Sequence, residues 1–245
     1  MMEWQGKRYW LVGASEGLGR ALAMTLSRAG AEVIVSARSQ DRLDALVEEL
    51  PGKARAVAVD VTDRQAVEQA AQDIGPIDGM IYLAGVYWPM AAQDWNPEQA
   101  EAMAEINFLG GIRAVGAVLP GMIDRGQGHI VLTGSLSGFR GLPGAIGYSA
   151  SKAGLIALGE SMQADLRKTP IRVQLANPGF IKTRLTEKND FRMPFIMTPE
   201  EAAQDMFELM NSDAFKRSFP MLFSWVFRLS QFLPDWAYYR LFGAR

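Results

Sequence analysis

Short apolar runs and amphipathic stretches alternate along the first 176 residues of the chain. The apolar runs are rich in valine, isoleucine and leucine and end at turn residues, which is typical of strands buried on both faces. We expect strands at Lys7–Ala14, Ala31–Ser36, Ala54–Val59, Asp78–Leu83, His129–Thr133 and Ile171–Ala176. The stretches between them predict helices at Gly17–Ala29, Asp41–Leu50, Asp63–Ile74, about Ala100 to Asp124, and Tyr148–Arg167.

Apolar strands that alternate with helices predict the α/β class: a doubly wound, Rossmann-type parallel sheet with helices on both faces. The span Phe180–Pro199 lacks this pattern and carries mixed charges after the last strand. We therefore expect it to be a mobile loop over a site. No repeat or linker interrupts the sequence, so residues 1–245 are expected to form one domain.

Composition limits the chemistry. A net charge of −2 gives no reason to expect a nucleic-acid partner. The chain has no cysteine and a single histidine, His129, which removes disulfides, thiolate nucleophiles and two-histidine zinc motifs and disfavours a Ser-His-Asp hydrolase. We expect His129 to be structural and expect no metal site. The N-terminal segment Met1–Lys7 has no apolar signal region, so we expect a cytoplasmic location.

A glycine-rich turn follows the first predicted strand. It reads Val12-Gly13-Ala14-Ser15-Glu16-Gly17-Leu18-Gly19 and opens the first predicted helix. Glycines allow the backbone to approach a pyrophosphate, and a helix N-terminus offers free N–H groups. Such glycines can also serve helix–strand packing alone, but the position between strand and helix favours a dinucleotide site.

The spacing of this turn resembles that of the short-chain dehydrogenase/reductase family, and further motifs follow in the family's order. They are Asp60-Val61, Ala84-Gly85, Asn107, Ser135, the Tyr148-x-x-x-Lys152 motif, and Pro178-Gly179 followed by Thr183. The resemblance covers roughly residues 5 to 210. The cofactor-binding residues that it implies are Gly13, Ser15, Glu16, Gly17, Leu18, Gly19, Arg38, Asp60, Val61, Ala84, Gly85, Tyr148, Lys152, Pro178, Gly179, Ile181 and Thr183.

The same resemblance implies four catalytic residues: Asn107, Ser135, Tyr148 and Lys152. Tyr148 would exchange a proton with a carbonyl or alcohol substrate. Lys152, one helical turn away, would lower the pKa of Tyr148 and hold the nicotinamide ribose. Ser135 would hydrogen-bond the substrate oxygen, with Ser137 as its rival. Asn107 would anchor a proton-relaying water, unless it is an ordinary exposed helix residue.

The end of the second predicted strand bears on cofactor choice. Members that prefer NAD carry an Asp there, whereas this chain has Ala37 followed by Arg38. An arginine can pair with the 2′-phosphate of NADP, and Ser15 and Ser39 could add hydroxyl donors. Glu16 argues against this, because a carboxylate repels a phosphate unless it points away. The sequence favours NADP(H), with NAD(H) as the alternative.

The chain departs from the family at two places. Leu83 replaces a usual asparagine before Ala84-Gly85, and the usual closing strand with its Asp-Gly-Gly ending is absent. Instead, residues 214–245 form an aromatic-rich extension in which helical spacing separates two sides. The polar side is Ser224, Arg228, Gln231 and Asp235, and the apolar side is Leu222, Trp225, Val226, Leu229 and Leu233.

Three environments would bury this apolar side. We expect packing on the chain's own domain or a partner subunit first, and the alternatives are the wall of an apolar substrate pocket and a membrane surface. The last two favour a lipophilic substrate. Pro234 is expected to end or restart the helix.

The hypothesis that the motifs favour is an oxidoreductase that moves a hydride between NADP(H) and a small-molecule carbonyl or alcohol, acting as a homodimer or homotetramer. One alternative is an NADP-binding sensor or scaffold without turnover. The other is a membrane-surface-associated reductase. The sequence does not identify the substrate.

Overall fold

The computed structural model describes residues 3–188 and 193–243. Seven parallel strands form one sheet in the order β3-β2-β1-β4-β5-β6-β7. They are β1 (Arg8–Val12), β2 (Glu32–Ser36), β3 (Ala54–Ala56), β4 (Gly79–Tyr82), β5 (Gly128–Thr133), β6 (Ile171–Pro178) and β7 (Lys216–Phe219). From β1 the chain adds strands first on one side (β2, β3) and then on the other (β4 to β7), so the strand order switches between β1 and β4. Sheets of this kind bind ligands at such a switch point, beside the carboxyl ends of the strands.

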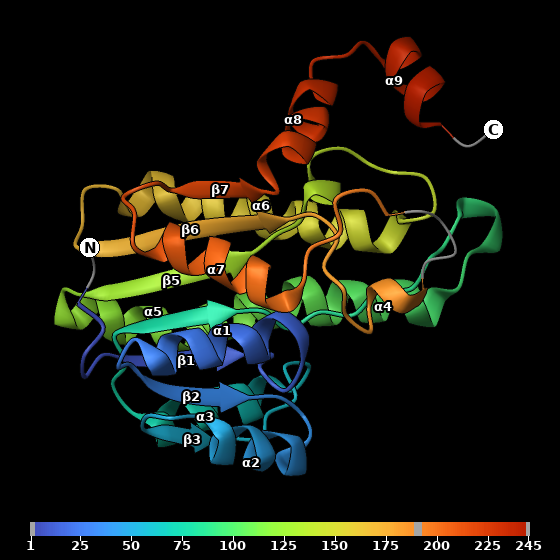
Figure 1. Cartoon of the computed structure of the whole chain (residues 1–245). Helices are drawn as coiled ribbons and strands as arrows, with labels where there is room; N and C mark the ends of the chain where they lie inside the picture. The colour runs from blue at the N-terminus through green and yellow to red at the C-terminus, as the bar shows by residue number, and fades with distance from the viewer. Residues whose placement is uncertain (1–2, 189–192, 244–245) are drawn as a thin grey trace.

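Helices cover both faces of the sheet (Figure 1). On one face lie α1 (Gly17–Arg28), α2 (Gln40–Glu49) and α7 (Pro199–Met210), and on the other α3 (Arg64–Ile74), α4 (Pro97–Ala104), α5 (Gly110–Arg125) and α6 (Ile146–Leu166). Each face has its own apolar core, one centred on α1 and α7 and the other on α3, α5 and α6. Residues that alternate along each strand supply both cores, so the apolar runs of the sequence are buried on both sides.

Helices α4 and α5 are joined by a π-helical turn, Glu105–Leu109, into one continuous helical stretch. Asn96 caps its start by accepting a hydrogen bond from the backbone N–H of Gln99. By length and composition alone, Pro97–Arg125 could cross a membrane. The buried faces of α4 and α5 nevertheless pack over the sheet, and a core helix has the same composition.

The C-terminal part contains elements beyond the predicted ones. Helix α7 starts at a capping box in which Thr198 and Glu201 satisfy each other's backbone N–H groups. Strand β7 then pairs in parallel with β6, so the expectation that the closing strand is absent is wrong. The strand forms because its buried end, Ser218 and Phe219, extends the sheet beside Asn177 and Pro178.

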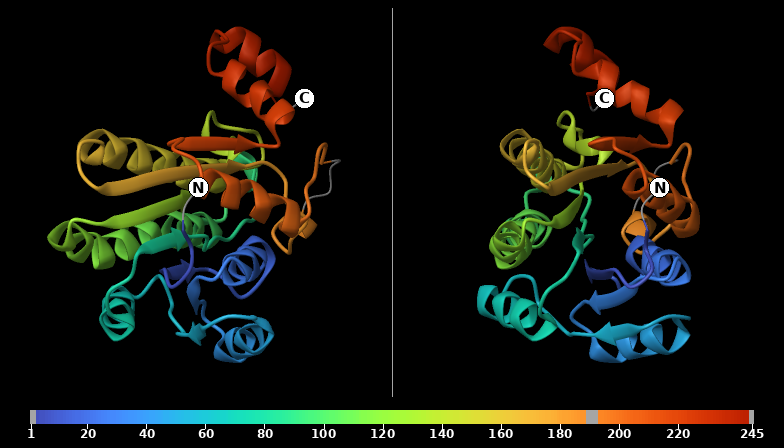
Figure 2. Two further views of the ribbon diagram at one scale, coloured as in Figure 1. Left: turned by 60° about the vertical axis from the view of Figure 1, so that its left-hand side comes forward. Right: turned by 90° about the vertical axis from the view of Figure 1, so that its left-hand side faces the viewer.

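The helical extension predicted after residue 214 is confirmed as α8 (Met221–Ser230) and α9 (Asp235–Phe242). Pro234 separates the two helices, as expected. The views in Figures 1 and 2 agree that both helices project beyond β7, the edge of the sheet. We call these two helices the arm. The predicted loop Phe180–Pro199 is irregular apart from a short 3₁₀ turn at Thr186–Lys188, and its residues 189–192 lie outside the described residues.

Candidate active site

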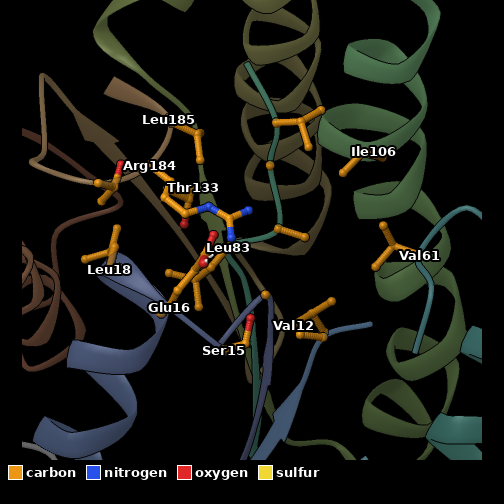
Figure 3. A pocket seen from close by; sticks show the side chains of 18 of the residues that line it. Val12, Ser15, Glu16, Leu18, Val61, Leu83, Ile106, Thr133, Arg184 and Leu185 are labelled. Carbon is orange, nitrogen blue, oxygen red and sulfur yellow. Dashed lines mark ion pairs between the residues drawn. The ribbon is translucent and has the colours of Figure 1, made fainter. Parts of the chain in front are cut away.

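A cavity of about 570 Å³ opens at the carboxyl ends of the strands, where the strand order reverses. Its walls come from the turn after β1, the ends of β2, β4, β5 and β6, and helix α6. All of the cofactor-binding residues predicted from the sequence line it. Figure 3 labels four of them, Ser15, Glu16, Leu18 and Val61. The topology therefore brings together residues that are far apart in the sequence.

The glycine-rich turn brings its backbone against neighbouring backbone. Gly13 has a φ of +98°, and a side chain there would collide with Ala84. A methyl group at Gly19 would overlap the carbonyl oxygen of Gly13. These close approaches let β1 turn directly into α1, whose first turn borders the cavity with its free N–H groups and so suits a pyrophosphate.

Two arginines neutralise the carboxylate of Glu16. Its Oε2 atom lies 3.2 Å from Nη1 of Arg42 on α2 and 3.3 Å from Nη1 of Arg184 in the loop after β6 (Figure 3). All three residues line the cavity, as does Arg38. The repulsion expected between Glu16 and a phosphate is therefore offset, and this part of the cavity carries a net positive charge.

Lys152 is buried in the wall of the cavity. Its Nζ atom donates a hydrogen bond to the carbonyl oxygen of Thr133, 2.8 Å away, and lies 5.7 Å from the centroid of the Tyr148 ring. Burial lowers the pKa of Lys152 to about 8, because the charged form loses hydration. The ammonium therefore remains the main form at pH 7.

Tyr148 does not titrate as the sequence suggested. Burial, together with the neighbouring Tyr87, raises the pKa of Tyr148 to about 12. A hydrogen bond with the side chain of Ser135 acts in the opposite direction. The expected lowering by Lys152 is not among these causes. The physical reason is that the phenol loses hydration, while the nearby ammonium is directed to the Thr133 carbonyl.

Ser135 and Ser137 form a short hydroxyl chain. Ser135 lies at the start of the 3₁₀ turn Leu136–Gly138, which follows β5. Its Oγ atom accepts hydrogen bonds from the backbone N–H of Ser137, at 3.2 Å, and from the Ser137 hydroxyl, at 2.9 Å. Ser137 thus orients Ser135, which in turn contacts Tyr148.

Asn107 is fully buried in the π-helical turn, so the alternative of an exposed helix residue is wrong. Its amide is paired with the backbone of Val86, accepting at 2.7 Å and donating at 3.0 Å, and it also donates to the Ser151 hydroxyl. These bonds hold the segment after Gly85 against α6. π-helical turns are often found at functional sites, and this one turns Asn107 toward the site.

The lone histidine lies in the core, away from the cavity lining. Its Nδ1 atom is 2.9 Å from the Tyr9 hydroxyl and its Nε2 atom is 2.9 Å from Oε1 of Gln174. Burial, together with the positive charge of Arg172, lowers the pKa of His129 to about 3. The hydrogen bond to Gln174 acts in the opposite direction. This geometry agrees with the structural role that we expected.

Aromatic residues flank the cavity on two sides. On one side, the Tyr87 ring lies edge-on to Tyr148 with centroids 5.1 Å apart. On the other side, Phe223 of α8 lies 5.8 Å from Phe180 and 5.6 Å from Phe195, both in the loop after β6. Helix α8 therefore contacts the loop beside the cavity, while none of its residues is among those that line the cavity; that the extension walls a substrate pocket stays a prediction.

Some residues of the cavity were not predicted. Arg42, Arg184 and Ile106 are lining residues that no motif marked. Arg42 could have been found, because it stands in the first turn of α2, shortly after Arg38, which follows the end of β2. Arg184 had no comparable signal, since its position depends on the path of an irregular loop.

Comparison with known proteins identifies relatives of this chain. Residues 7–192 match the family model described as short chain dehydrogenase. A protein of Myxococcus xanthus named only as an uncharacterized oxidoreductase is 36% identical over 243 residues, which cover 96% of each chain. The 3-oxoacyl-[acyl-carrier-protein] reductase of Thermotoga maritima is 36% identical over 194 residues, 76% of this chain and 79% of that protein.

Solved structures agree with the fold. A short chain dehydrogenase of Burkholderia cenocepacia in complex with NADP covers all of this chain and all of its own, with a TM-score of 0.88 and 24% identity. A short chain dehydrogenase/reductase of Burkholderia phymatum in complex with NAD covers 94% of each chain, with a TM-score of 0.86 and 21% identity. The first alignment extends over α8 and α9, so the arm does not prevent superposition of the whole chain.

Proposed function

Since the chain belongs to the short-chain dehydrogenase/reductase family, we propose that it transfers a hydride between NADP(H) and a carbonyl or secondary alcohol. One observation carries this proposal. Tyr148 and Lys152 line the same cavity as the glycine-rich turn, and Ser135 is hydrogen-bonded to Tyr148. A protein that only binds a dinucleotide does not need this arrangement of groups that can donate and accept protons.

The residues of the cavity fit a nicotinamide dinucleotide. Close backbone packing at Gly13 and Gly19 lets β1 turn directly into α1, which opens at the cavity with free N–H groups. Arg38 and Arg42 support NADP(H) over NAD(H), because guanidinium groups suit a 2′-phosphate and β2 ends without an acidic residue at Ala37. The cofactor would supply or accept the hydride.

The proton would come from Tyr148. A phenol with a pKa of about 12 is protonated at neutral pH, so Tyr148 is ready to act as an acid toward the oxygen of a carbonyl. The Ser135 hydroxyl would hold that oxygen and stabilise the negative charge that develops on it. Lys152, still cationic at pH 7, would hold the ribose and favour the charge left on Tyr148. The protonated Tyr148 is the form that reduction of a carbonyl requires.

We further propose a lipophilic substrate. Val86, Tyr87, Trp88 and Tyr148 pack together with Met90 and Met103, so one side of the site is apolar. Phe180 and Phe223 form the other side. The Thermotoga maritima relative is named as a reductase of 3-oxoacyl groups, which agrees with a carbonyl on an acyl chain.

The assembly and location stay proposals. We propose that the 245 residues work as one domain in a homodimer or homotetramer in the cytoplasm. The outer face of α4 and α5 supports an oligomer, because Leu109, Ile112 and Ile123 are exposed on it. Light scattering after gel filtration would test the oligomeric state.

The test of function is a panel of ketones and 3-oxoacyl thioesters of increasing chain length, followed by NADPH absorbance. We expect turnover that improves with chain length. Replacement of Tyr148 by Phe should reduce kcat at least ~100-fold, the usual contribution of general acid–base catalysis, with NADPH affinity kept. NADPH binding without turnover of any panel member would instead favour the sensor or scaffold, and near-native kcat in Tyr148→Phe would contradict the role of Tyr148.

A further inference from the structure

The two helices of the arm present large apolar side chains to the outside. They are Met221, Leu222, Trp225, Val226 and Leu229 of α8, Phe232 of the connection, and Trp236, Tyr239 and Leu241 of α9. Phe232 is 85% exposed and Trp236 is 74% exposed. We call this set the outer face. An apolar surface of this extent, left in contact with water, marks a site of interaction.

The side of the arm that docks on the protein is its polar side. Ser224 and Ser230 are buried, together with Phe227. Arg140 donates to the carbonyl oxygens of Ser230 and Leu233, both at 2.8 Å, and pairs with Asp235 at 2.6 Å. The sequence pattern correctly divided the helix into two sides, but the apolar side does not pack on the chain's own domain. The hydrogen bonds and the ion pair of Arg140 thus hold the arm in an orientation that turns the outer face away from the rest of the protein.

The arm carries more positive than negative charge. Helices α8 and α9 contain two arginines, Arg228 and Arg240, and one acidic residue, Asp235. The carboxylate of Asp235 is already paired with Arg140, so it does not offset those arginines. The arm is therefore cationic, although the chain as a whole has a net charge of −2. Two tryptophans and a tyrosine on the outer face are residue types that favour the boundary between water and lipid.

The apolar surface continues toward the mouth of the cavity. Phe195 and Ile196, in the loop after β6, are exposed. The Phe195 ring lies 5.6 Å from that of Phe223, on the same helix as Trp225. An occupant of the outer face would therefore also reach the loop that borders the site.

We propose that the outer face docks on an anionic phospholipid surface. Arg240, which is exposed, and Arg228, which lies beside the ring of Trp225, would complement lipid phosphates, and the apolar and aromatic side chains enter the boundary between headgroups and acyl chains. A second copy of the chain fits less well, because it would bring together two arms that each carry a net positive charge. Docking does not depend on the proposed reaction, since it uses only the arm and the loop beside it.

The test is vesicle binding by the full chain, without cofactor or substrate. Vesicles of phosphatidylcholine with phosphatidylglycerol at equal parts are compared with phosphatidylcholine alone in co-sedimentation. We expect the wild type to bind the anionic vesicles and to bind less as salt is raised. The double variant Trp225→Glu, Trp236→Glu should bind at least tenfold more weakly. The control is Trp95→Glu, which makes the same change at a tryptophan that is 56% exposed, just before α4 and outside the arm, and should bind as the wild type does.

A second measurement needs no variant: brominated acyl chains should quench the tryptophan fluorescence of the bound wild type. Absence of vesicle binding by the wild type, or equal binding by the double variant, would overturn the proposal. A wild-type oligomer that the double variant dissociates, together with no vesicle binding, would overturn it in favour of an interface between copies. None of these results bears on NADPH turnover, which is measured separately.

Discussion

At the scale of single residues, Lys152 shows how burial makes a charged group sensitive to pH. Its ammonium is enclosed in the protein and has one carbonyl acceptor, Thr133. Burial lowers the pKa of this lysine to about 8, so the folded protein loses the charge as pH rises through 8. An unfolded chain keeps this positive charge up to a pH of about 10.4. Between pH 8 and pH 10.4 only the unfolded chain binds the proton, so the burial of Lys152 makes the free energy of unfolding rise as pH rises through this range.

The first prediction follows from that loss of charge. Above pH 8, Lys152 can no longer offer a cation to the cofactor, so the Kd for NADPH should rise with an inflection near pH 8. Fluorescence titration between pH 6.5 and 9.5 measures it. Lys152→Gln should bind more weakly and without the inflection, whereas an inflection that persists in this variant would assign it to another group.

The second prediction concerns His129, whose pKa burial lowers to about 3. Below pH 6.5, the unfolded chain binds a proton that the folded protein excludes, so stability falls as pH falls toward 3. Between pH 7.5 and 5 the loss should be about 2 kcal/mol, from the usual 1.4 kcal/mol per pH unit. Urea unfolding at both pH values measures it.

His129 is the only histidine, so its replacement gives a clean comparison. His129→Gln should be less stable at pH 7.5, because the glutamine side chain cannot bond both Tyr9 and Gln174 as the two ring nitrogens of His129 do. Its stability should nevertheless change little between pH 7.5 and 5. An equally steep loss in this variant would show that the acid sensitivity has another origin.

At the scale of elements, the start of α2 and the end of β2 together decide cofactor preference. Arg38 lies just before α2 and Arg42 lies in its first turn, and both line the cavity. The third prediction is that Ala37→Asp with Arg38→Ala shifts preference toward NAD(H). A hydrogen bond to a charged group is worth about 1.5–3 kcal/mol, so the Kd for NADPH should rise more than tenfold.

Titration of both cofactors by fluorescence measures this preference. The control is Glu16→Gln, which weakens the restraint on Arg42 and Arg184 and leaves Arg38 in place. It should retain NADP(H) preference. A wild-type protein that binds NADH more tightly than NADPH would contradict the assignment of Arg38.

Periodicity predicted the interior elements well and the C-terminal ones poorly. The first six strands correspond to apolar runs of the sequence, but β7 is four residues that begin with Lys216 and Arg217, and only pairing with β6 makes it a strand. The pattern of α8 gives two sides without saying which one meets the protein. Motif spacing placed Tyr148 and Lys152 at the cavity, but their pKa values depend on burial, which spacing does not contain.

At the scale of the whole molecule, Arg140 connects the arm to the rest. Its side chain binds two carbonyl oxygens and Asp235, and its guanidinium lies 3.9 Å from the centroid of the Tyr238 ring. The fourth prediction is that Arg140→Ala loosens the arm without unfolding the sheet. Hydrogen exchange should become at least tenfold faster in α9, because the loss of charged hydrogen bonds costs about 1.5–3 kcal/mol.

Amides of β5 provide the internal reference for that experiment, since they lie in the centre of the sheet. Their exchange should be unchanged in Arg140→Ala. Unchanged exchange in α9 would mean that the Tyr238 hydroxyl, which donates to the carbonyl oxygen of Gly141 at 2.6 Å, is sufficient to hold the arm.

The place of Arg140 in the chain has a mechanical consequence. It stands between Ser135 and Tyr148, so the anchor of the arm and the groups that would move the proton share one stretch of backbone. A force on α9 would reach this stretch through the bonds of Arg140 to Ser230, Leu233 and Asp235, in addition to the backbone path through Pro220 into β7. In a protein attached to a surface by its arm, that force would therefore act on the segment that positions Ser135 and Tyr148, and the rate of turnover would depend on the tension at the attachment.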